Sequence, residues 1–141
     1  MKLSKAGRLV PVILLALALA MELRSALYWQ GLITDESLTI HGDLSNLWLR
    51  HGIYGAVILL LGVFAIRGSK VCIGLMSLLM AWYARGAYST AGPLSARGPA
   101  EREIAQWALQ TTALYLLLAL AFAAFFVVVL VRSRRIKSPP V

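Results

Sequence analysis

The sequence predicts an all-α fold: an integral membrane four-helix bundle that forms a single domain over residues 1–141. Hydrophobic residues make up 60% of the chain and charged residues only 14%, and the mean hydropathy is +0.75. Soluble domains carry about a quarter charged residues, so this chain has too few charges to solvate a globular surface. Four long apolar runs follow one another, and each has basic residues at one end. These observations indicate a multi-pass membrane protein.

The four apolar runs cover residues 9–29, 47–66, 71–90 and 104–131. A helix rises 1.5 Å per residue, so about twenty residues cross a hydrocarbon core of about 30 Å. Helices are expected because an open strand would leave backbone groups unpaired in lipid. The connections are 30–46, a tight turn at 67–70, and 92–100, where Pro93 and Pro99 predict a break. Residues 132–141 are expected to form a basic, unstructured cytoplasmic tail.

The distribution of charge predicts the orientation. With the N-terminus inside, the inner side holds nine basic residues and no acid, while the outer side holds five basic residues and all six acids. This asymmetry predicts both termini in the cytoplasm, with the protein in a bacterial inner membrane. The net charge of +8 does not indicate nucleic-acid binding, because the basic clusters abut apolar runs and no aromatic-interleaved basic face is present. The nine inner residues are Lys2, Lys5, Arg8, Arg67, Lys70, Arg132, Arg134, Arg135 and Lys137.

The first apolar run has two interpretations. Its basic start, the apolar stretch at 9–17 and the sequence Ala18-Leu19-Ala20, with small residues at the cleavage positions, resemble a signal peptide cleaved after Ala20. Pro11 lies early in the run, and apolar character continues past Glu22 to Trp29, which favours a retained helix. Cleavage would leave three spans in the same orientation.

Polar residues from four separate runs fall at a similar depth. Counted at 1.5 Å per residue from the basic anchor of each run, they lie about 21–26 Å in, below the outer edge of the core. Gln110, Thr111 and Thr112 lie one turn higher and join this layer if the last helix tilts. The candidate binding residues are Glu22, Arg50, His51, Arg85 and Tyr115.

Glu22 is expected to face the bundle interior, because a charge at this depth is costly unless it is paired or hydrated. Arg85 and Arg50 are its expected partners. Arg24 points to a nearly opposite face, so it is expected to extend toward the outer surface. Two interpretations of this layer stay open. It is either a pocket, open to the outside, for an anionic or amphipathic ligand or a partner's side chain, or a set of paired charges that fixes helix register.

Small residues predict close helix packing at three stripes. In the second run they are Gly52, Gly55 and Gly62, and comparable stripes occur in the third and fourth runs. An intramolecular bundle is the first expectation, and a homodimer through one stripe is an alternative.

A search for catalytic motifs returns none, so the protein is expected not to be an enzyme and to need no cofactor. Cys72 is the single cysteine, which excludes an internal disulfide and a thiolate cluster. His41 and His51 have no third ligand at metal spacing, so no metal site is expected.

Two segments carry a resemblance to a known group. The residues Arg50-His51-Gly52-Ile53-Tyr54-Gly55 open the second run, Arg85-Gly86-Ala87-Tyr88-Ser89 end the third, and Glu101 or Glu103 precedes the fourth. This pattern resembles small bacterial four-helix membrane proteins of unknown function, including the DoxX-like group. The resemblance covers most of the chain after the first run, and it implies the fold and no activity.

Three functions follow as hypotheses. The first is a non-enzymatic accessory or assembly subunit, or a protective partner of another membrane protein, which acts by binding in the lipid bilayer. The alternative is a ligand-binding or transport bundle with a polar pocket in the outer leaflet. The third is a membrane enzyme acting on lipid or quinone through His51.

Overall fold

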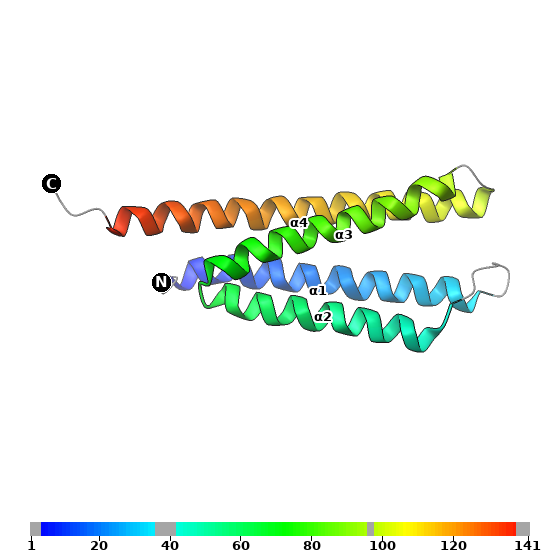
Figure 1. The fold of residues 1–141 in the computed structure, drawn as a ribbon, viewed down its shortest axis with the longest axis horizontal. Helices are drawn as coiled ribbons and strands as arrows, with labels where there is room; N and C mark the ends of the chain where they lie inside the picture. The colour runs from blue at the N-terminus through cyan, green and yellow to red at the C-terminus, as the bar shows by residue number, and fades with distance from the viewer. Residues whose placement is uncertain (1–3, 36–41, 96–97, 138–141) are drawn as a thin grey trace.

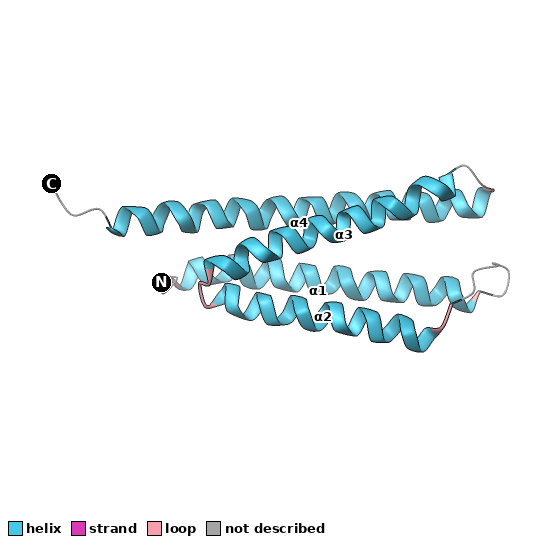
Figure 2. Ribbon diagram, in the orientation of Figure 1, coloured by secondary structure: helices cyan, strands magenta, loops and turns pink. Residues whose placement is uncertain are grey.

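The computed structural model describes residues 4–35, 42–95 and 98–137, and it is all-helical in these ranges. The helices are α1 (Lys5–Thr34), α2 (Leu44–Ile66), α3 (Lys70–Ser95) and α4 (Pro99–Lys137). Each is long and apolar enough to cross a membrane. The predicted four-helix, all-α architecture is therefore confirmed, and it indicates a multi-pass membrane protein (Figure 2).

The helices extend beyond the apolar runs because polar residues cap them. Ser4 accepts a hydrogen bond from the Gly7 backbone N–H at the start of α1, and Asp43 accepts one from the Ser45 backbone N–H at the start of α2. The expected break at 92–100 is shorter than predicted, since α3 continues through Pro93 to Ser95. The expected tail is helical over residues 132–137, which continue α4.

The predicted tight turn joins α2 to α3. Gly68 has a φ of 92°, a left-handed conformation that favours glycine. Its N–H bonds the Ala65 carbonyl at 2.9 Å, and the Ser69 N–H bonds the Phe64 carbonyl at 3.0 Å. This Schellman motif satisfies the last carbonyls of α2 and reverses the chain within three residues.

The four helices form two pairs, α1 with α2 and α3 with α4, and the second pair makes the more extensive contact. The start of α1, the α2–α3 turn and the end of α4 lie at one end of the bundle, which we call the termini end (Figure 1). The end of α1, the start of α2, the end of α3 and the start of α4 lie at the opposite end, which we call the loop end (Figure 1). In the same view, α3 begins near the first pair and then runs along α4.

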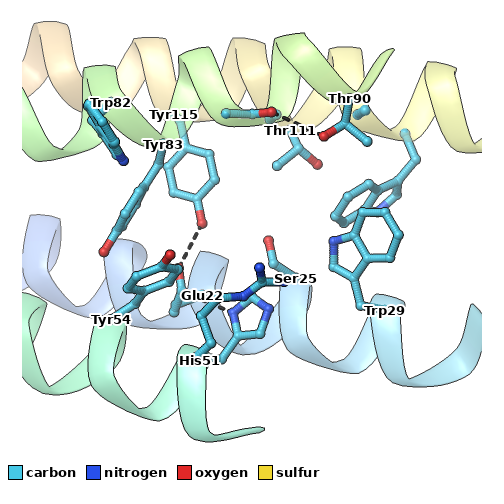
Figure 3. A pocket seen from close by; sticks show the side chains of 15 residues that line it. Glu22, Ser25, Trp29, His51, Tyr54, Trp82, Tyr83, Thr90, Thr111 and Tyr115 are labelled. Atoms are coloured by element: carbon cyan, nitrogen blue, oxygen red, sulfur yellow. Dashed lines mark hydrogen bonds and ion pairs between the residues drawn. The ribbon is translucent and has the colours of Figure 1, made fainter. Parts of the chain in front are cut away.

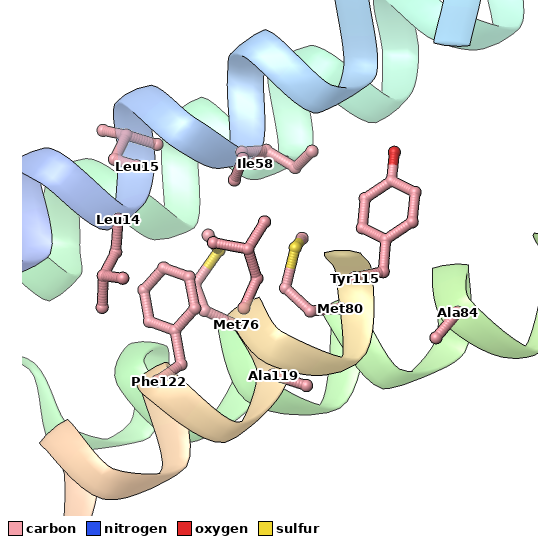
Figure 4. Close-up of a cluster of buried hydrophobic side chains, with 11 residues drawn as sticks. Leu14, Leu15, Ile58, Met76, Met80, Ala84, Tyr115, Ala119 and Phe122 are labelled. Carbon is pink, nitrogen blue, oxygen red and sulfur yellow. The ribbon is translucent and has the colours of Figure 1, made fainter. Parts of the chain in front are cut away.

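A closely packed core of buried apolar side chains fills the half of the bundle toward the termini end. Its side chains come from all four helices and interlock (Figure 4). Phe122, Ile58, Met76 and Met80 are essentially inaccessible to solvent. A Cβ on Gly62 would overlap the Leu15 side chain, so glycine allows α1 and α2 to approach here. The full cluster is Leu14, Leu15, Ala18, Ile58, Met76, Met80, Ala84, Tyr115, Leu118, Ala119 and Phe122.

Candidate functional site

The Glu22 carboxylate is the centre of a polar cluster at the loop-end limit of the core. Glu22 is only 5% exposed, so it faces the bundle interior as predicted. Nδ1 of His51 lies 2.5 Å from Oε1 of Glu22, and the Tyr115 hydroxyl donates to Oε2 at 3.1 Å (Figure 3). Three helices, α1, α2 and α4, therefore meet at one carboxylate, and both of its oxygens have a partner.

Helical periodicity places these three side chains on inward faces. Glu22 lies four residues after the buried Ala18 and four before the buried Ala26. His51 likewise lies four residues after the buried Leu47 and seven before the buried Ile58. Residues spaced by three, four or seven share a helix face, so the faces that build the core also carry the polar cluster.

The hydrogen bonds of the cluster satisfy both oxygens of the Glu22 carboxylate. One carboxylate oxygen of Glu22 accepts from the Tyr115 hydroxyl, and the other accepts from Nδ1 of His51 when that nitrogen carries the proton. This arrangement supplies the partners that a buried charge needs in a membrane protein. It also leaves Nε2 of His51 able to hydrogen-bond a further group.

The expected pairing of Glu22 with Arg85 or Arg50 is wrong. Among the described residues, the ion pair of Glu22 is with His51. Arg85 is exposed on α3, next to the buried Ala84, and Arg50 is exposed beside His51 on α2. Successive residues in a helix differ by about 100° in direction. Within the described residues, neither guanidinium forms an ion pair with the carboxylate, although Arg50 lines the same cavity as Glu22.

Arg24 also differs from the expectation. Instead of extending toward the surface, its guanidinium donates to Oγ1 of Thr111 at 3.0 Å and lies 5.1 Å from the centroid of the Trp107 ring. Tyr28 stacks on Trp107 with centroids 3.8 Å apart and planes 6° apart. The long side chain reaches sideways around α1 to α4, where a hydroxyl and an aromatic face bind it. Both Glu22 and Arg24 therefore contact another helix.

A cavity of about 240 Å³ opens beside the polar cluster, and all four helices line it. Tyr54, Tyr83 and Tyr115 lie toward one end, and the Trp29 indole lies at the other (Figure 3). The Trp107 ring centroid is 6.4 Å from that of Trp29. The Tyr83 ring is 5.3 Å from that of Tyr54 and 5.5 Å from that of Tyr115. The cavity is thus a slot between two aromatic walls.

Hydroxyl groups and small residues line the middle of this slot. Ser25 and Thr111 are 7% and 2% exposed, respectively. Ala108 and Gly86 add little bulk, and Arg50 reaches the cavity from α2. The full lining is Glu22, Ser25, Trp29, Arg50, His51, Tyr54, Trp82, Tyr83, Gly86, Ala87, Thr90, Trp107, Ala108, Thr111 and Tyr115.

No protein-family model, curated protein or solved structure matches this chain. The resemblance to the DoxX-like group stays a prediction.

Four of the five candidate residues line this cavity: Glu22, Arg50, His51 and Tyr115. Arg85 does not. Of the residues expected to join if α4 tilts, Thr111 does so, while Gln110 is exposed and Thr112 bonds its own helix at the Ala108 carbonyl. His41 lies outside the described residues.

Sequence reasoning missed the aromatic walls and Ser25. A signal was present for Ser25, Trp29 and Tyr54, because each shares a helix face with a candidate residue. Tyr83, in contrast, lies two residues from Arg85 and therefore on another face of α3. Ser25 and Trp29 follow Glu22 by three and seven residues, and Tyr54 follows His51 by three. Extending each candidate residue along its helix face would have found them.

Proposed function

We propose that this protein is a membrane protein that binds a small ligand in the cavity at its loop end. One observation carries the proposal: a buried carboxylate, held by His51 and Tyr115, forms part of the wall of a cavity of about 240 Å³. Ionisable groups inside spanning helices are expensive, and they mark functional sites by default. Concave sites with a few converging polar groups among aromatic walls are typical of small-molecule binding.

Binding is favoured over transport by the packing next to Glu22. Toward the termini end, the bundle is filled by side chains such as Leu15, Ile58, Met76 and Phe122. A solute that entered the cavity would meet this core, so passage to the other side would require the helix pairs to separate. The arrangement therefore suits a bound ligand on one side of the membrane.

The accessory-subunit function that the sequence favours first has no comparable feature among the described residues. Large apolar side chains are exposed on every helix, for example Leu17, Leu60, Leu78 and Leu117, at 50–69%. Lipid-facing surfaces have this property whether or not a partner binds. Copurification from mild detergent tests this alternative, and a stoichiometric second protein would favour it.

The proposed orientation puts the termini end in the cytoplasm of an inner membrane. The basic residues of the three clusters that the structure describes support it, because α1, the α2–α3 turn and α4 carry them to the same end of the bundle. Lys70 and Ser133 illustrate this grouping, with Nζ donating to Oγ at 2.7 Å. In this orientation the cavity lies toward the outer leaflet.

A matched pair of glycine variants tests the proposed function. Gly86 lines the cavity, and a Cβ there would meet no atom within 4 Å, so Gly86→Phe should fold and occupy the cavity or its mouth. Gly31 is equally open but does not line the cavity, so Gly31→Phe is the control. Native mass spectrometry from lipid nanodiscs should show a bound small molecule on the wild type and on Gly31→Phe, but not on Gly86→Phe. A wild-type protein without bound molecule, or equal occupancy in all three, would contradict the proposal.

A further inference from the structure

A second hollow lies on the other side of the Glu22–His51 pair. It is a groove of about 180 Å³ between α1 and α2, and its remaining lining is apolar or aromatic. Glu22 and His51 line both the groove and the cavity between the helix pairs, so they form a partition common to the two. A molecule in the groove can therefore reach the same polar cluster. The other residues of the groove are Leu19, Leu23, Ala26, Trp48, Gly52 and Gly55.

Glycine keeps the groove open. A Cβ on Gly52 or Gly55 would meet no atom within 4 Å, whereas a Cβ on Gly62 would overlap Leu15. Hence α1 and α2 touch at Gly62 and leave free space about two to three turns closer to the loop end. Leu23 beside this space is 54% exposed, so the groove opens onto the apolar exterior of the bundle. For a pair of spanning helices, that exterior contacts lipid chains, and the chemistry that fits the groove is a single hydrocarbon chain.

The charges around the two hollows favour an anionic head group. Glu22 has partners on both oxygens, and Arg24 is bound to Thr111. Arg50 lines the cavity, and within the described ranges its guanidinium makes no ion pair. The two guanidinium groups of Arg24 and Arg50 outnumber the one carboxylate of Glu22, so the net charge around the two hollows is positive. Guanidinium groups bind carboxylate and phosphate oxygens in charge-assisted pairs, and Nε2 of His51 can add a further hydrogen bond.

We infer that the ligand is a single-chain anionic amphipath, whose chain lies in the α1–α2 groove and whose head group binds at Arg50 and His51. This inference rests on the proposed function and adds the class of ligand to it. A fatty acid and a single-chain phosphate lipid share the required chemistry. One groove accommodates one chain, so two-chain lipids are disfavoured.

Quenching of tryptophan fluorescence tests this inference, because Trp48 lines the groove and is 39% exposed. Protein in phosphatidylcholine vesicles is titrated with spin-labelled stearic acid, which should quench saturably. Gly55→Leu should weaken binding about tenfold by filling the groove. Gly31→Leu is the matched control and should bind like the wild type.

Arg50→Gln should also weaken binding about tenfold, as expected for loss of a charge-assisted hydrogen bond. Circular dichroism and membrane abundance show whether each variant folds, and Gly52→Leu is the substitute if Gly55→Leu does not.

Two further labelled ligands test the head group, and the combined results distinguish failure of this inference from failure of the proposed function. The methyl ester of the same labelled acid should bind about tenfold more weakly, and equal binding would overturn the anionic head group. A labelled single-chain phosphate ester distinguishes the two lipid sources: preference for either anion supports the inference and identifies the head group. Saturable binding that is lost in Gly86→Phe but unchanged in Gly55→Leu would overturn the groove while the proposed function stands. No saturable quenching together with a bound mass in native spectra overturns only this inference, and absence of both overturns the proposed function as well.

Discussion

At Gly62, in the half of the bundle toward the termini end, α1 and α2 approach so closely that a Cβ would overlap Leu15, whereas at Gly55 and Gly52 a Cβ would meet no atom within 4 Å. The same change occurs on α4. Phe122 and Leu118 belong to the apolar core, Tyr115 belongs to the core and also lines the cavity, and Thr111 lines the cavity alone. One set of helix faces thus builds a packed half and an open half. Glycines on one helix therefore have opposite effects, because Gly62 faces a side chain of α1 at close range and Gly52 and Gly55 face open space.

The largest expected effect concerns the first helix. Leu14, Leu15 and Ala18 of α1 form one wall of the packed half. Cleavage after Ala20 would remove that wall and leave Glu22 near a chain end. We expect α1 to be retained, because the core depends on it. The intact mass of protein purified from membranes should then be about 15.4 kDa, and a mass lacking residues 1–20 would contradict the retained helix.

A large loss of stability is expected when a substitution in the packed half leaves an empty space in the core. Ile58 is fully buried, and Leu60 on the same helix is 60% exposed. Ile58→Ala should lower the free energy of unfolding by about 3–4 kcal/mol, and Leu60→Ala by less than about 0.5 kcal/mol. Unfolding in mixed micelles measures both. Similar losses for the two variants would mean that the termini half is not closely packed.

A smaller loss is expected where the two halves meet. His51→Ala leaves the buried Glu22 without its ion-pair partner and should cost about 2–3 kcal/mol. His51→Gln keeps a hydrogen-bond donor and should cost about 1 kcal/mol. The same unfolding assay compares the two variants. If His51→Ala is as stable as the wild type, Glu22 is not held as a buried charge.

The sequence sufficed for the helices and for the height of the polar layer, but not for its partners. Hydropathy locates four apolar runs, yet capping by Ser4 and Asp43 and the helical course through Pro93 set the ends. Counting residues from the basic end of each helix gives the depth of a residue in the membrane, and this count placed Glu22, His51 and Tyr115 at a similar depth. The rotation of each helix about its axis depends on packing across the bundle. For that reason Arg85 faces outward and His51, not an arginine, pairs with Glu22.

The smallest effect is expected at the loop end, outside both halves of the bundle. The Ser45 hydroxyl and backbone N–H donate to Asp43 and hold the pKa of its carboxyl below the usual 3.8. Since the folded pKa is the lower one, this cap stabilises α2 at neutral pH and is lost as the pH falls below 3.8 through the folded value. Thermal unfolding of the wild type should show a small acid-induced loss that Asp43→Asn lacks. The same acid response in both would contradict the cap.

Thiol labelling tests the contrast between the two halves most directly. In a Cys72→Ser background, Ser25→Cys puts a thiol on the cavity wall, and Ser77→Cys puts a partly buried one at the α3–α4 contact of the packed half, where the native hydroxyl donates to the Ala119 carbonyl at 2.9 Å. Both changes are nearly isosteric. A water-soluble maleimide reacts with thiolate only where water reaches it. We predict rapid labelling of Ser25→Cys, suppressed by Gly86→Phe, and no labelling of Ser77→Cys. Equal labelling of the two thiols, or an unreactive thiol at position 25, would contradict an open polar cavity above a closed core.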